Sequence, residues 1–215
     1  LITQNTDFVI HDAGATAIGT RVLNARNRTS NSIGYITPDF GGLTFMARYY
    51  FNGEEKAIPA TGPIKSEGDI KQMDLGVNYR VGALGIGIGY GQDRKTGGLA
   101  ANDFDKKAMI VAGYDFGPIN VYGLYGRDQY NATSTRRENV DFWLVGASLP
   151  VSANGKVTAN YMEREVQSDR DGVLKKFQIG YGHKLSKRTT LFALYDRDDP
   201  NSNVSNDVIT NFSVG

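Results

Sequence analysis

The side chains that most often carry out catalysis are scarce in this sequence. It contains two histidines, His11 and His183, and no cysteine. The lack of cysteine excludes thiolate nucleophiles, thiolate metal sites and disulfides. His11 adjoins Asp12, but a zinc site needs more ligands and a serine hydrolase needs a nucleophile held by its base. His183 adjoins Lys184 in an alternating segment, as expected of a residue near a strand end. We therefore predict no enzyme, no metal site and no cofactor.

A glycine-rich stretch runs from Gly85 to Gly91. It does not have the spacing of a dinucleotide-binding loop, and no helical pattern follows it. Apolar residues alternate with its glycines, which indicates a strand with one face bare of side chains. The bare face predicts that something bulky packs against it.

The composition narrows the class of protein. The formal net charge of +1 argues against nucleic-acid binding, which usually requires a clustered basic excess. No stretch approaches the roughly 20 apolar residues of a membrane-spanning helix. The mean hydropathy of -0.37 would suit a soluble protein, but strands that are apolar outside and polar inside give the same average. The pattern along the chain must therefore decide.

Alternation with a period of two divides the chain into about eleven segments, most of them near the 10 residues that a tilted membrane strand needs. One example is the run of Leu43, Phe45, Ala47, Tyr49 and Phe51. The predicted strands are 32–39, 43–53, 69–81, 83–93, 105–116, 118–129, 139–150, 155–166, 173–185, 189–198 and 206–215.

The connections between these segments alternate strictly between short turns and long polar loops. Such a rhythm is typical of outer-membrane β-barrels, with short turns on the periplasmic side. Aromatic residues gather near the predicted strand ends, where two interfacial girdles would place them. These are Tyr35, Tyr79, Tyr90, Tyr114, Phe116, Tyr125, Tyr161, Tyr181 and Tyr195. A soluble sandwich or propeller that uses the same residues as core stays open as an alternative.

An open sheet of about eleven strands would leave two long exposed edges, which natural proteins avoid. We therefore expect further strands before residue 1, or a second chain that closes the sheet, and favour the first. Leu1 is not an initiator methionine, and Gly215 falls inside a predicted strand. The expectation is a mature or trimmed fragment.

Three motifs resemble Gram-negative general porins, most closely the β-proteobacterial and neisserial branch. Residues 31–43 (NSIGYITPDFGGL) resemble the segment that follows the constriction loop in that family. Residues 180–191 (GYGHKLSKRTTL) resemble the turn before the penultimate strand. Residues 211–215 (NFSVG) are similar to the start of the closing strand. The resemblance runs through the chain from about Asn31.

The resemblance implies a transmembrane antiparallel barrel of sixteen strands, of which residues 31–215 supply roughly strands six to sixteen as one domain. It makes residues 1–30 the third loop, which folds into the barrel and narrows it. The lack of sustained alternation in this stretch suits an irregular segment against a wet lumen wall. Opposed acids and bases would there set up a transverse field that filters solutes. The candidate constriction residues are Asp7, Asp12, Arg21, Arg26 and Arg28.

Because successive side chains of a strand point to opposite faces, the odd or even position of each residue (its parity) predicts which charged residues face the lumen. These are Arg48, Asp74, Arg80, Asp93, Lys156, Arg164, Lys176, Lys184 and Asp196. Cations outnumber anions in this set, and a weak anion preference follows as a hypothesis.

Together these features predict an all-β porin of the bacterial outer membrane that lets ions and small hydrophilic solutes diffuse passively. The resemblance implies a homotrimer, and we expect contacts with outer-membrane lipid and lipopolysaccharide. The alternative is a closed-lumen barrel that acts as an adhesin or surface-binding module through its long loops. Pore current would separate the two.

Overall fold

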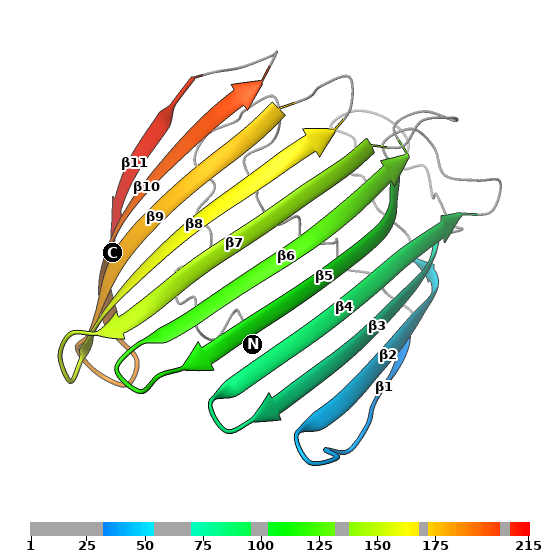
Figure 1. Cartoon of the computed structure of the whole chain (residues 1–215), viewed down its shortest axis with the longest axis horizontal. Coiled ribbons are helices and arrows are strands. Elements are labelled where there is room, and N and C mark those ends of the chain that lie inside the picture. Colours follow the sequence, from blue (N-terminus) through cyan, green and yellow to red (C-terminus); the bar gives the residue numbers. More distant parts are fainter. Residues whose placement is uncertain (1–31, 54–69, 96–102, 132–137, 168–171, 203–206) are drawn as a thin grey trace.

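The computed structural model describes residues 32–53, 70–95, 103–131, 138–167, 172–202 and 207–215. These residues form one sheet of eleven strands, each antiparallel to the next in chain order (Figure 1). The strands are β1 Ser32–Ile36, β2 Leu43–Gly53, β3 Ile70–Val81, β4 Leu84–Lys95, β5 Asp103–Asp115, β6 Asn120–Asn131, β7 Glu138–Pro150, β8 Gly155–Gln167, β9 Gly172–Lys184, β10 Thr190–Ser202 and β11 Ile209–Val214. No helix within the described residues is long and apolar enough to cross a membrane.

The eleven strands predicted from alternation are confirmed, with most boundaries shifted by a few residues. The largest difference is in β10, which runs to Ser202 instead of ending at residue 198. Pro200 lies within this extension, beyond Asp198, where the pairing with β11 begins. Here β10 has β9 as its one neighbour among the described residues, and proline is tolerated on such an edge.

The short turns lie together at one end of the sheet (Figure 1). The tightest joins β3 to β4 through Gly82 and Ala83, and Gly82 has a φ of 52°, which favours glycine. In the turn between β1 and β2, Gly42 has a φ of 93° and its N–H donates to the Asp39 carboxylate. The predicted long connections fall largely outside the described residues.

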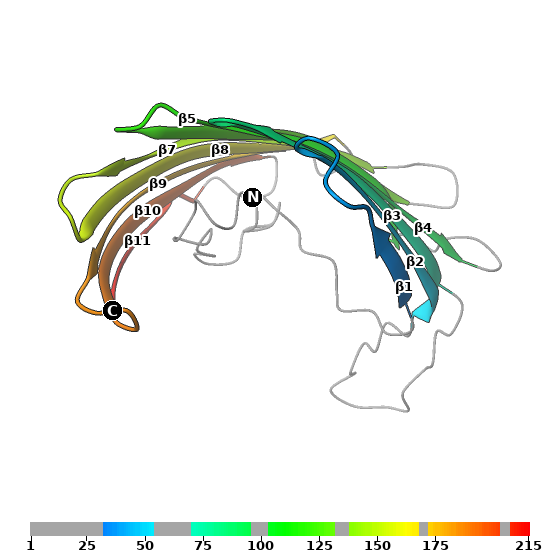
Figure 2. The same ribbon diagram turned by 90° about the horizontal axis from the view of Figure 1, so that it is seen from below.

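The sheet curves into an arc with a convex and a concave face (Figure 2). Residues paired across antiparallel strands point to the same face, so the register assigns the faces strand by strand. One row runs through Tyr35, Ala47, Leu75, Tyr90 and Ala108 on the convex face. Large apolar side chains on this face are well exposed, among them Ile88 and Val145, both more than half exposed.

Several strands bury an apolar cluster on the concave face. It is made of Tyr122, Leu124, Val140, Phe142, Leu144, Met162, Val166 and Leu174. The sequence reasoning did not single out this cluster. Strand β7 is apolar on both faces, with Phe142 and Leu144 inside and Trp143 and Val145 outside. Parity alone therefore could not say which face of β7 would be polar.

Candidate pore wall

The nine charged residues predicted to face the lumen all lie on the concave side of the sheet. The register ties them to one face: Arg48 pairs with Asp74, and that row continues through Gly91 and Lys107 to the buried Asp128. On strands β8 to β10, the buried Met162 shares its face with the other five predicted residues, which are Lys156, Arg164, Lys176, Lys184 and Asp196. That this face lines a pore remains a prediction.

A buried ion pair joins β9 to β10 on the concave face. Lys176 Nζ lies 3.1 Å from a carboxylate oxygen of Asp198, and both side chains are fully buried. Asp196 and Gln178 face the same side and are equally buried. The sequence reasoning named Lys176 and Asp196 but missed Asp198, although parity places residues 196 and 198 on the same face. Charges held in this way have fixed positions on the wall.

A second charge pair on the same face was also missed. Lys107 Nζ lies 3.5 Å from Asp128 of the neighbouring strand β6. The same ammonium stands over the Phe142 ring, 5.3 Å from its centroid. A cation over an aromatic face is stabilised electrostatically. The signal that would have found both residues is again strand parity.

Glycine allows a polar contact to pass over a strand. The Tyr122 hydroxyl of β6 donates to Asn160 Oδ1 of β8 at 2.5 Å, although β7 lies between them. Gly146 of β7 sits in register with both residues and has no side chain in the way. The ring and the amide occupy the space that a Cβ of Gly146 would need.

At the β2–β3 side of the sheet, polar residues differ in exposure: Tyr50 and Asp93 are buried, whereas Arg48 and Arg80 are exposed. Arg48 Nη1 donates to the Tyr50 hydroxyl at 3.3 Å, and Gln72 Nε2 donates to Asp93 at 3.2 Å. Arg80 lies near the short-turn end of β3 and is exposed. This wall therefore presents both basic and acidic groups to the concave side.

The concave-face charges whose side chains the structure describes change the balance expected from the sequence. Besides the nine predicted residues, the face carries Lys107, Asp105, Asp115, Asp128 and Asp198. Basic and acidic side chains are then equal in number. The described wall alone does not decide whether anions or cations are preferred.

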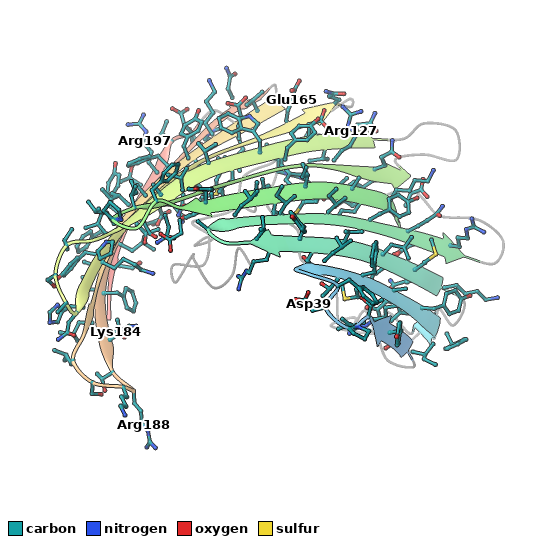
Figure 3. The ribbon with its side chains drawn as sticks, turned by 60° about the horizontal axis from the view of Figure 1, so that its bottom comes forward. Asp39, Arg127, Glu165, Lys184, Arg188 and Arg197 are labelled. Atoms are coloured by element: carbon teal, nitrogen blue, oxygen red, sulfur yellow. The ribbon has the colours of Figure 1, made fainter. Side chains whose placement is uncertain are left out.

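The convex face has the opposite character. The nine aromatic residues predicted to form girdles all lie on it, and Trp143 packs against Tyr161 with ring centroids 5.4 Å apart. Nearer the long-loop end, Arg127 donates to both carboxylate oxygens of Asp141, at 2.5 and 2.7 Å. Figure 3 shows Arg127, Glu165 and Arg197 projecting from this side. Tyr35, Tyr79, Tyr114 and Tyr181 lie within three residues of the short-turn ends of their strands, as a girdle requires, whereas Tyr90, Tyr125, Tyr161 and Tyr195 lie near the middle of theirs.

The five candidate constriction residues, Asp7, Asp12, Arg21, Arg26 and Arg28, lie outside the described residues, as does His11. His183 contacts the Tyr181 hydroxyl through Nδ1 at 3.0 Å. Within the described residues, no group of three side chains could hold a metal ion.

Residues 2–203 match the sequence profile of the Gram-negative porins. The chain belongs to the Gram-negative porin family. This membership covers nearly all of its length and agrees with the arrangement of the strands. It gives no support to the alternative of a closed-barrel adhesin.

Individual porins are similar over the same region. Outer membrane porin protein 32 of Delftia acidovorans is 31% identical over 165 residues, which cover 77% of this chain and 45% of that protein. An outer membrane porin protein of Bordetella pertussis is 22% identical over 77% of this chain and 51% of its own length. The chain thus spans about half the length of these curated relatives.

The fold is also shared with a solved porin. The anion-selective porin from Comamonas acidovorans superposes with a TM-score of 0.71 at 26% identity, covering 87% of this chain and 58% of that one. The eleven strands therefore follow the path of a porin wall.

Proposed function

We propose that this protein is a passive diffusion channel of the bacterial outer membrane for ions and small hydrophilic solutes. The observation that carries the proposal is the opposite polarity of the two faces. Apart from its apolar cluster, the concave side holds charged and polar side chains along the strands, whereas the convex side exposes apolar residues and aromatic rings and gathers its charges toward the long-loop end. A water-filled lumen surrounded by lipid requires that distribution. Porins transport without covalent chemistry, which is consistent with a protein that is not an enzyme.

We assign the narrowest part of the channel to residues 1–30, with Asp7, Asp12, Arg21, Arg26 and Arg28 as its charged groups. The apolar cluster on the concave face supports this assignment. Phe142, Leu144 and Met162 would be poor lining for a water-filled lumen, yet each is at most 1% exposed. In this proposal a constriction loop would cover them, which would keep the remaining lumen polar and reduce its cross-section.

A preference for anions is the finer part of the proposal. One relative is described as an anion-selective porin. Three arginines accompany two aspartates in residues 1–30, whereas the charges of the described wall are balanced. Selectivity would then come from the constriction, where charge acts on a solute at the shortest distance.

We further propose that the protein forms a homotrimer. The part of the convex surface outside the contacts between subunits would then face lipid and lipopolysaccharide. The charged rim near the long-loop end, which includes Arg127, Asp141, Glu165 and Arg197, would meet the phosphorylated headgroups of the outer leaflet. Basic side chains at that depth gain from anionic groups.

Planar-bilayer recording of the complete natural protein under a KCl gradient tests the proposal. Large steady current steps that close in threes are expected from an open trimer, and the reversal potential reports the sign of selectivity. Correctly folded, heat-modifiable protein that passes no current would refute the channel. A strong cation preference would refute the anion preference alone.

A further inference from the structure

Glycines on the concave face differ in whether a neighbour fills the space above them. A Cβ on Gly126 would meet the Phe142 ring, and one on Gly146 would meet the Tyr122 ring. At Gly76 the Met46 Cε would lie 3.1 Å away. Neighbouring side chains therefore lean over these three glycines, as aromatic residues often do in sheets.

Gly89 of β4 is different, because a Cβ placed on it would have no atom of the described residues within 4 Å. In the register it lies between Gly76 of β3 and Met109 of β5. Two residues along the strand, Gly87 is shielded by Asn78 Oδ1 at 3.1 Å and Val111 Cγ2 at 3.4 Å. Among the described residues, the bulky partner expected for the bare face of this strand does not reach Gly89, and none of these residues fills the space above its backbone.

We infer that Gly89 is a size-determining position of the solute route, where the missing side chain widens the lumen. Its depth supports this reading: Gly89 is five residues from the short-turn end of β4, which at about 3.3 Å per residue and a tilt of about 40° is about half of an apolar band roughly 25 Å tall. Gly76 beside it in the register also lacks a side chain, but the Met46 Cε reaches over it, so the uncovered position is Gly89 itself. The inference rests on the proposed channel function, since a size limit has meaning only for an open pore.

Substitution at Gly89 should change the lumen without opposing the fold, because a Cβ there meets no atom of the described residues. Gly89→Ala, Gly89→Leu and Gly89→Trp in the complete protein should lower the single-channel conductance progressively. Liposome swelling should show a greater loss of permeation for larger sugars than for small ones. Ile88→Trp is the matched control, because Ile88 adjoins Gly89 but projects from the convex face and is 53% exposed; its conductance should stay at the wild-type value.

A smaller change keeps the test valid if the tryptophan variant does not fold. The chain contains no cysteine, so Gly89→Cys introduces one defined thiol. A charged, water-soluble methanethiosulfonate reagent should modify this thiol and reduce the current during recording, whereas Ile88→Cys should remain unmodified in the bilayer. A wild-type protein that conducts, combined with an unreactive Gly89→Cys or a normally conducting Gly89→Trp, would overturn the inference. A folded wild type without current would instead refute the channel itself.

Discussion

Replacing Ile110 of β5 with arginine tests whether the convex face lies in a membrane. Ile110 is 45% exposed and stands in register between Ile88 and Tyr125. On the surface of a soluble protein, such a substitution would change the free energy of unfolding by no more than about 0.5 kcal/mol. In a bilayer, an arginine facing lipid is destabilising to a degree that depends on its depth.

The depth of Ile110 follows from its place in the strand. It lies five residues before Asp115, where β5 ends at the short turns. With a rise of about 3.3 Å per residue and a tilt of about 40°, this is about 13 Å along the membrane normal. The apolar band of such a barrel is about 25 Å tall, so Ile110 is near its middle. The expected loss is then about 2–4 kcal/mol, or roughly 30-fold to several-hundred-fold in the unfolding equilibrium.

Urea unfolding in lipid vesicles, followed by the heat-modifiable mobility shift, measures this loss. Val121→Arg is the depth control, because Val121 is similarly exposed at 41% but is the second residue of β6; its loss should be about 0–1 kcal/mol. Gly89→Arg is the face control, at the same depth as Ile110 on the concave side, and should be nearly neutral. Equal losses for Ile110→Arg and Val121→Arg, or a large loss for Gly89→Arg, would show that the assignment of faces is wrong.

Two further substitutions test the packing of the wall. Lys176→Met should destabilise the protein by about 3–5 kcal/mol in the same urea assay, because it leaves the buried Asp198 carboxylate without its cation. Combining Lys176→Met with Asp198→Leu should recover most of that loss. A double variant as unstable as the single one would contradict the pairing. Gly42→Ala should lower the free energy of unfolding by more than the roughly 1–2 kcal/mol expected for an alanine in the left-handed conformation, since its Cβ would also collide with the Arg80 carbonyl oxygen. At Gly82 a Cβ would meet no atom of the described residues within 4 Å, so Gly82→Ala should show the conformational cost alone. Equal urea midpoints for the two alanine variants would refute the collision.

The sequence determined the elements and most of the faces. A period of two places apolar residues on one face of a strand and polar residues on the other, which suits a sheet with a different environment on each side. The eleven strands and the concave position of Arg48 or Lys184 were therefore predictable. The short turns were equally predictable, because Gly82 and its neighbours leave no room for a longer connection. Where β7 is apolar on both sides, the same argument failed, and Phe142 was not recognised as an inward residue.

The tertiary structure decided which of these residues meet. Alternation gives a residue its face but not its partner, because the partner depends on the register between strands and on side chains that lean over glycines. The contact of Lys176 with Asp198 depends on the β9–β10 register, and that of Tyr122 with Asn160 depends on the bare backbone of Gly146. Gly89 was one of four alternating glycines in the sequence. The structure set it apart, because within the described part of the chain no side chain reaches the space above it.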